Sequence, residues 1–373
     1  MKKEHVSKIL IGALGIIMGI FFVLSIVGIV NLLREKQNEK QEENNTQAIE
    51  RQENVPTAKQ ADLQQLTWKQ VDPAFIPWPK RDSHGLVVFR DTLWLMGGLG
   101  GEPQQKEYWN MPHYSDIWSS SNGTNWELVT NNAPWQQRRS LPLVVFQDKL
   151  WLMGGWNNTV WKYQNDIWNT SDGENWKRVS KQTAWEGREG HTITQFQGKL
   201  WLMGGVRFDT RKTYNDIWIS ENGKDWSIVT ESAPWSPRYD HAVATFQNKL
   251  WLIGGVPLGG ADATNDIWVS EDGLNWQLVT DNAPFSVRHG LALEVYENTL
   301  WIISGWDTKQ GKGIRDVWYS KNGLEWQKTS QNAPWRGRED HATAVFQGKL
   351  WLTGGMTEDW SWNNEIWYSS FEP

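Results

Sequence analysis

Cysteine is absent from the 373 residues of this chain. Disulfides, thiolate metal sites and cysteine nucleophiles are therefore excluded. A positive charge excess is also missing, since 37 Lys and Arg residues stand against 43 Asp and Glu residues. Nucleic-acid-binding proteins usually carry the opposite balance. Catalytic triads, phosphate-binding glycine loops and metal-ligand spacings are not recognisable. We therefore predict no nucleic-acid partner, no cofactor and no metal.

Charged residues are missing from residues 9–33, which read ILIGALGIIMGIFFVLSIVGIVNLL. A helix of this length would extend roughly 37 Å and cross a hydrocarbon core of about 30 Å. The run is longer than the apolar core of a cleaved signal peptide and ends in no small-residue cleavage site. It predicts a transmembrane signal anchor after a cytoplasmic tail at residues 1–8. The short tail favours a single-pass cell membrane protein with its folded part on the extracytoplasmic side.

The regions in and after this span suggest how the chain is displayed. Gly15 and Gly19 form a GxxxG pair that permits a dimer through the transmembrane helix. Residues 34–64 are rich in Gln, Asn, Glu and Lys and nearly lack large apolar side chains. Such a segment cannot bury enough surface to fold alone. We interpret it as a polar linker.

Tryptophan is abundant, with 29 copies, and its spacing reveals a repeat of 50 residues after a longer first unit. The run LWLMGG, or a variant of it, begins at Leu93, Leu150, Leu200, Leu250, Leu300 and Leu350. A second tryptophan follows in DIW or its variants at Trp118, Trp168, Trp218, Trp268, Trp318 and Trp367. Six copies of one structural unit are therefore expected.

Each unit contains four strand-sized runs, which we name strands a to d. In the third unit they are His191 to Phe196, Leu200 to Gly204, Asp216 to Ser220 and Trp226 to Thr230. Strand b is apolar on both faces, as expected for a sheet between neighbouring sheets. Asn-Gly or Asp-Gly between strands c and d favours a tight hairpin. The pattern indicates blades of a radially packed β-propeller.

The last unit ends without a strand d, at NEIWYSSFEP. Residues 66–71, LTWKQV, match the missing pattern. A propeller over residues 65–373 would therefore be closed by strand 66–71 joining the last blade, which removes exposed strand edges.

The 50-residue period, the double glycine and the later tryptophan resemble the kelch-repeat, galactose oxidase-like family of six-bladed β-propellers, bacterial type, over residues 65–373. This resemblance implies an all-β fold. The turn from Ser270 to Trp276 is similar to a shortened aspartate box, which is structural. Galactose oxidase itself needs a tyrosine joined to a cysteine, so its mechanism is excluded. Bacterial sialic-acid epimerases (mutarotases) share the six-bladed fold, which implies a sugar-acting isomerase as an alternative.

The d-to-a and b-to-c connections of such blades emerge on one face, where arginine is concentrated. The candidate ligand-binding arginines are Arg81, Arg188, Arg238 and Arg338, and Arg138 and Arg288 occupy the same register. Their guanidinium groups suit carboxylates or other anions. Each blade also carries an acid at the start of strand c, so the alternative is a set of ion pairs that tie blade to blade.

Six tryptophans outside the repeat lie in the b-to-c connections: Trp109, Trp156, Trp161, Trp306, Trp360 and Trp362. Exposed rings there would stack on sugars or anchor a protein. We expect the blades not to need them. The first connection is the longest, with 17 residues between Gly98 and Asp116, and it adds His113 to the candidate ligand-binding residues.

Two other features have a structural and a functional interpretation. Glu294 stands at a register that holds Val, Thr or Ala in the other blades, so it is the candidate general base if burial raises its pKa, with a salt bridge as the alternative.

A shared register also holds His84, His191, His241 and His341. Residues spread around a ring cannot all reach about 2 Å from one ion. We interpret these histidines as hydrogen-bonding supports of strand a.

The sequence thus predicts a membrane-anchored binding or scaffolding module that takes a glycan or protein ligand through its Trp- and Arg-bearing face. A sugar-acting enzyme is the alternative, and a purely structural spacer is the third class. These classes differ in whether the tryptophans outside the repeat are needed for binding.

Overall fold

A computed structural model describes residues 63–101, 111–259 and 261–371. The predicted tail, the anchor at residues 9–33 and nearly all of the linker lie outside the described residues, as does Trp109. Within the described ranges, no helix is long and apolar enough to cross a membrane.

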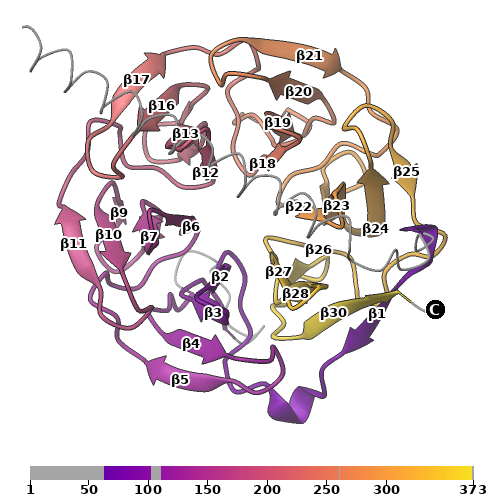
Figure 1. Ribbon diagram of the computed structural model, residues 1–373, viewed down its shortest axis with the longest axis horizontal. Helices are drawn as coiled ribbons and strands as arrows, with labels where there is room; N and C mark the ends of the chain where they lie inside the picture. Colours follow the sequence, from indigo (N-terminus) through magenta and orange to yellow (C-terminus); the bar gives the residue numbers. More distant parts are fainter. Residues whose placement is uncertain (1–62, 102–110, 260, 372–373) are drawn as a thin grey trace, which may run out of the picture. The chain divides into compact units, whose positions relative to one another are not determined.

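Six four-stranded antiparallel sheets surround a central axis (Figure 1). The predicted all-β, six-bladed propeller is confirmed. The innermost strands a are β2 (Gly85–Phe89), β6 (Leu143–Phe146), β12 (Thr192–Phe196), β18 (Ala242–Phe246), β22 (Ala292–Tyr296) and β27 (Ala342–Phe346). Strands b are β3 (Thr92–Met96), β7 (Lys149–Met153), β13 (Lys199–Met203), β19 (Lys249–Ile253), β23 (Thr299–Asp307) and β28 (Lys349–Thr353).

The outer half of each blade is built in the same way. Strands c are β4 (Ile117–Ser120), β10 (Ile167–Thr170), β16 (Ile217–Ser220), β20 (Ile267–Ser270), β24 (Lys312–Ser320) and β30 (Ile366–Phe371). Strands d are β5 (Glu127–Thr130), β11 (Lys177–Ser180), β17 (Ser227–Thr230), β21 (Trp276–Thr280), β25 (Gln327–Lys328) and, for the last blade, β1 (Leu66–Gln70). Two 3-10 turns, η1 (Leu63–Gln65) and η2 (Pro73–Phe75), flank β1.

The sixth blade takes its outermost strand from the start of the propeller. β1 pairs antiparallel with β30, with Leu66 opposite Phe371 and Gln70 opposite Trp367. In Figure 1 the indigo strand β1 lies beside the yellow strand β30. The backbone N–H of Val71 extends the pairing by donating to the carbonyl of Ile366 at 2.9 Å. The first and last strands of the ring are thereby joined in one sheet.

The hydrophobic core lies between neighbouring blades. One cluster joins Trp201 and Met203 of the third blade to Leu250 and Leu252 of the fourth. The Trp201 ring also packs on the backbone of Gly273, where a methyl group on the glycine Cα would come within 2.4 Å of the indole. The same contact joins five of the strand-b tryptophans to the c-to-d turn of the next blade. The sixth blade has no such turn, because its strand d is β1.

Short hairpins form within the b-to-c connections on one face. They are β8 (Trp156–Asn157) with β9 (Lys162–Tyr163), β14 (Val206–Arg207) with β15 (Lys212–Thr213), and the outer ends of β23 and β24. In the sixth blade β26 (Arg338–Glu339) pairs with β29 (Met356–Thr357). These connections position the candidate site.

Candidate functional site

The b-to-c and d-to-a connections meet on one face, as predicted. In five blades an isolated bridge pairs the residue after the repeat arginine with a b-to-c connection, for example Arg139 with Trp156 and His289 with Trp306. In the sixth blade Glu339 pairs with Met356 within β26 and β29. We call these six residues the mouth residues: Asp82, Arg139, Glu189, Tyr239, His289 and Glu339. They differ from blade to blade, whereas the arginine before each of them does not.

The six repeat arginines are buried and paired. Arg238, for example, donates from Nη1 and Nη2 to the two carboxylate oxygens of Asp266 at 2.6 and 2.7 Å, and to the carbonyl of Gly254 at 2.8 Å. Burial alone would raise the pKa of Asp266, but the hydrogen bonds and charge of Arg238 lower it. Arg81, Arg138, Arg188 and Arg288 are held in the same way, and Arg338 pairs with Glu365 through Nη2 alone while Nη1 donates to the Asn363 side chain. Each of these arginines is at most 1% exposed.

These ion pairs lie within one blade, which corrects the expectation of blade-to-blade pairs. Arg238 precedes strand a of the fourth blade and Asp266 precedes strand c of the same blade. The tie between blades uses backbone atoms instead, since the N–H of Gly205 in the third blade donates to the carbonyl of Arg238 at 2.8 Å. The guanidinium groups are thus engaged in structure, and the chemistry accessible at the mouth comes from other residues.

Next to the mouth residues, a belt of backbone hydrogen bonds links neighbouring blades at five of the six junctions around the channel. Its members, the belt residues, are Ser83, Ser140, Gly190, Asp240, Gly290 and Asp340. Each bond runs from one blade to the next, as from Asp240 N–H to Gly190 carbonyl at 2.9 Å and from Asp340 N–H to Gly290 carbonyl at 3.0 Å. The belt narrows the channel and directs side chains from different blades toward one space.

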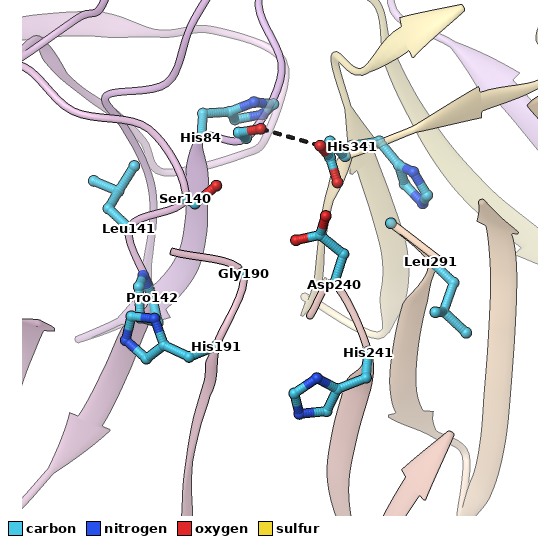
Figure 2. A pocket seen from close by; sticks show the side chains of 13 residues that line it. His84, Ser140, Leu141, Pro142, Gly190, His191, Asp240, His241, Leu291 and His341 are labelled. Atoms are coloured by element: carbon cyan, nitrogen blue, oxygen red, sulfur yellow. Dashed lines mark hydrogen bonds between the residues drawn. The ribbon is translucent and has the colours of Figure 1, made fainter. Parts of the chain in front are cut away.

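A cavity of about 200 Å³ lies at this mouth. We call it the mouth cavity. Its floor and walls are formed by Ser83, Arg139, Ser140, Glu189, Phe208, Tyr239, Asp240, His289, Glu339, Asp340, Met356 and Trp360. A second cavity of about 200 Å³ lies against the belt and the histidine register. Figure 2 shows His84, His191, His241 and His341 around this second cavity, with the carboxylate of Asp240 directed into it.

Carboxyl groups are the most numerous titratable groups of the mouth. Arg139 pairs with Glu189 through Nε and Nη2 at 2.8 and 3.1 Å. Burial raises the pKa of Asp82 to about 8, and the neighbouring charge of Asp340 adds to the shift. Burial and the charge of Asp340 also raise the pKa of Asp240 and of Glu339 well above the ordinary carboxyl range. The groups interact because the ring brings them together from separate blades.

Two of the candidate residues support the mouth from beneath its rim. Trp156 is 3% exposed and its ring lies under Arg139, whose guanidinium carbon is 4.8 Å from the ring centroid. His113 packs edge-on against Trp156 at 5.1 Å and contacts the Met111 carbonyl through Nδ1 at 3.1 Å. Burial, and then the charge of Arg139, lower the pKa of His113 to about 3. His113 is therefore neutral at physiological pH and contributes packing.

The tryptophans outside the repeat divide into two groups. Trp161 and Trp360 are 66% and 60% exposed, and half-buried Trp306 lies 6.0 Å from Trp360 between ring centroids. Trp362 is 5% exposed and donates from Nε1 to Asp82 at 2.9 Å. Trp156 and Trp362 therefore pack beneath the mouth, whereas Trp161 and Trp360 are exposed to solvent.

The histidine register and Glu294 lie deeper. His84 contacts the Thr353 hydroxyl through Nε2 at 2.7 Å, and burial lowers the pKa of His191, His241 and His341 to about 3. Glu294, in β22, accepts a hydrogen bond from the Thr343 hydroxyl at 2.7 Å, so its partner is not the cation of the expected salt bridge. Burial raises the pKa of Glu294, against the lowering effect of that bond. Among the described residues, no group of three or more His, Asp or Glu residues is arranged to hold a metal ion.

The mouth residues other than arginine were missed by the sequence argument. The available signal was a position directly after the repeat arginine at which every blade carries a polar or charged residue. These six positions are 50 or more residues apart in the chain, and they come together only when the blades close into a propeller.

Comparison with known families agrees with this geometry. The family model described as the KLHDC2/KLHL20/DRC7 Kelch-repeats domain matches residues 143–355, which is more than half of the chain. A search among curated proteins found no match.

Proposed function

Because the chain belongs to the kelch-repeat family, whose propellers typically serve as protein-binding or scaffolding modules, we propose that it is a protein-binding module that uses its mouth face. The observation that carries this proposal is the exposure of two large aromatic rings on the mouth face, Trp161 and Trp360, of which Trp360 lines the mouth cavity. Exposed tryptophans are costly in water and are typical anchors of protein interfaces.

The backbone at these two positions supports the same proposal. Trp161 and Trp360 occupy tips of b-to-c connections with φ of 48° and 58°, and the fifth blade has Gly311 at a comparable tip with φ of 62°. A tryptophan in this left-handed region costs more than a glycine. Neither ring is buried in the blades, so the strain is not offset by core packing.

We expect the double variant Trp161→Ala and Trp360→Ala to bind partner proteins at least about tenfold less well, since truncation of an interface anchor typically costs about 2 kcal/mol or more. Its free energy of unfolding should change by less than about 0.5 kcal/mol per site. The measurement is chemical cross-linking of the full chain in the cells that produce it, with quantification of the attached proteins.

The matched control is the double variant Leu128→Ala and Leu278→Ala, which removes side chains of 49% and 48% exposure from the outer strands β5 and β21. It should recover the same proteins as the unaltered chain. Equal recovery by the tryptophan variant and this control would contradict the assignment of the mouth face. Competition by soluble glycans, but not by proteins, would assign the face to a sugar ligand instead.

Residues 9–33 support the further proposal that the module is displayed at a membrane, with the propeller on the extracytoplasmic side. An uncharged apolar run of this length is sufficient for one membrane span. We expect the full-length protein to stay in the membrane pellet after alkaline carbonate extraction, and a variant without residues 9–33 to appear in the supernatant. A soluble mature form that starts near residue 34 would contradict the anchor.

A further inference from the structure

The ionisable groups accessible at the mouth are not the repeat arginines that the sequence predicts. All six repeat guanidinium groups are withdrawn into ion pairs within their own blades. The mouth cavity is instead lined by the carboxyl groups of Glu189, Asp240, Glu339 and Asp340. Arg139 also lines it and is paired with Glu189. An anionic ligand would therefore meet a mostly acidic wall.

Glu339 is the clearest sign that a partner cation belongs in the cavity. Its side chain is 9% exposed and lines the cavity, and its close contact is His289 Nδ1 at 3.3 Å. That nitrogen makes no hydrogen bond among the described residues, and burial lowers the pKa of His289 to about 4, so the imidazole is neutral. No hydrogen bond stabilises the Glu339 carboxylate within the described part of the chain. A buried carboxylate without a charged partner is costly.

Another buried carboxyl group, Asp82, lies behind the cavity wall. Oδ1 of Asp82 is fully buried and has no hydrogen-bond partner among the described residues, while Oδ2 accepts from Trp362. Asp82 interacts with Asp340, which lines the cavity and accepts a hydrogen bond from Ser83 at 3.2 Å. The carboxyl groups thus converge from several blades, with Arg139 as the fixed positive charge beside them.

Aromatic and apolar side chains complete the wall. Phe208 and Tyr239 meet edge-on at 5.4 Å, and Trp360 and Met356 lie on the same cavity. Aromatic faces attract ammonium groups and also pack on the alkyl stem of a lysine. A lysine ammonium is a compact charge with three donors, so it suits carboxylates arranged around a cavity better than the planar fork of an arginine does.

We infer that the mouth cavity binds the side-chain ammonium of a lysine presented by a partner protein, with Asp240, Glu339 and Asp340 as acceptors and Trp360, Phe208 and Tyr239 around the alkyl stem. This inference rests on the proposed binding function and names the chemistry of the partner. The belt places the acceptors and the b-to-c connections place the aromatic rings.

The pH dependence has a definite sign. The charged and titratable groups that face Asp240 and Glu339 are Asp82, Glu189, Asp340, Arg139 and His289, with Tyr239 beside them. Carboxyl groups with a raised pKa hold protons that a bound ammonium would displace. Affinity should therefore rise as the pH increases from 6 to 8, and the ammonium stays charged until about pH 10.

The test is isothermal titration of the full chain in detergent micelles with Nα-acetyl-lysine-N-methylamide. The uncharged norleucine analogue, of similar shape, is the control ligand. We expect the lysine probe to bind at least about tenfold more tightly than the norleucine probe at pH 8, and more tightly at pH 8 than at pH 6. Asp240→Asn and Glu339→Gln should each weaken the lysine probe about tenfold.

Glu231→Gln is the matched control variant, because Glu231 is exposed on a d-to-a connection away from the cavity lining. It should leave the binding unchanged. Equal affinities of the lysine and norleucine probes, or unchanged binding by both mouth variants, would overturn the inference. Tighter binding of 1,5-diaminopentane or calcium chloride than of the lysine probe would also overturn it. The cross-linking result with the tryptophan variant decides the proposed function separately, since it requires no lysine probe.

Discussion

Replacement of residues 65–72 by glycine and serine should remove most of the stability of the propeller. The replacement deletes β1 and leaves the edge of β30 unpaired. It also removes Leu66 and Val71, each 5% exposed, and the Trp68 ring, which packs edge-on against Trp335 at 4.7 Å. Loss of one large buried side chain typically costs about 2 to 5 kcal/mol. Several such losses approach the roughly 5 to 15 kcal/mol that stabilises a typical domain.

The measurement is thermal unfolding of the full chain in detergent, followed by tryptophan fluorescence. If the replaced chain does not fold, the single variant Trp68→Ala provides the comparison and should lower the melting temperature by several degrees. A synthetic peptide of residues 63–72 should restore part of the stability of the replaced chain, because it supplies the missing strand in trans. An unchanged melting temperature in the replaced chain would show that β1 does not close the ring.

Trp201→Ala should cost about 3 to 5 kcal/mol of the free energy of unfolding, the range typical of large core truncations. The ring is 3% exposed in strand b of the third blade, and its Nε1 donates to the Phe196 carbonyl at 3.0 Å. The truncation opens a void between the third and fourth blades, where the indole contacts Gly273. Denaturant unfolding measures this loss.

The control for this prediction is Trp161→Ala, the same substitution at a ring that is 66% exposed. It should change the free energy of unfolding by less than about 0.5 kcal/mol. Gly273→Ala should also destabilise the protein, since Gly273 has φ of 75° and a methyl group there would meet Trp201. In the Trp201→Ala background the steric part of that cost should disappear. Equal losses for Trp201→Ala and Trp161→Ala would mean that the repeat position does not mark the core.

Local patterns were enough to place most strands within about one residue. The third blade was predicted at His191 to Phe196 for strand a and Leu200 to Gly204 for strand b, and the structure has Thr192–Phe196 and Lys199–Met203. Hairpins of a repeated blade are local structures, in which turn residues and apolar periodicity set the ends of each strand. Residues paired in β1 and β30 are about 300 positions apart, yet their repeat pattern indicates the same blade.

Burial and pairing within the connections depended on the tertiary structure. Trp156 and Trp161 lie five residues apart in the same b-to-c connection, but one ring packs under Arg139 and the other faces solvent. Sequence periodicity has no information on this difference, because the connections follow no strand or helix period. The sequence also could not decide the role of the repeat arginines. An arginine and an acid on the same face can form an ion pair with each other, or the arginine can bind a ligand.

The sequence by itself determined the number of blades, the register of their strands and the positions of the repeat arginines, because each of these repeats with the period of one blade. Only the tertiary structure decided which ionisable groups a ligand would meet. The repeat arginines pair within their own blades. Asp240, Glu339 and Asp340 line a common cavity, although Asp240 and Asp340 are 100 residues apart in the chain. Ring closure creates that proximity, and no local pattern encodes it.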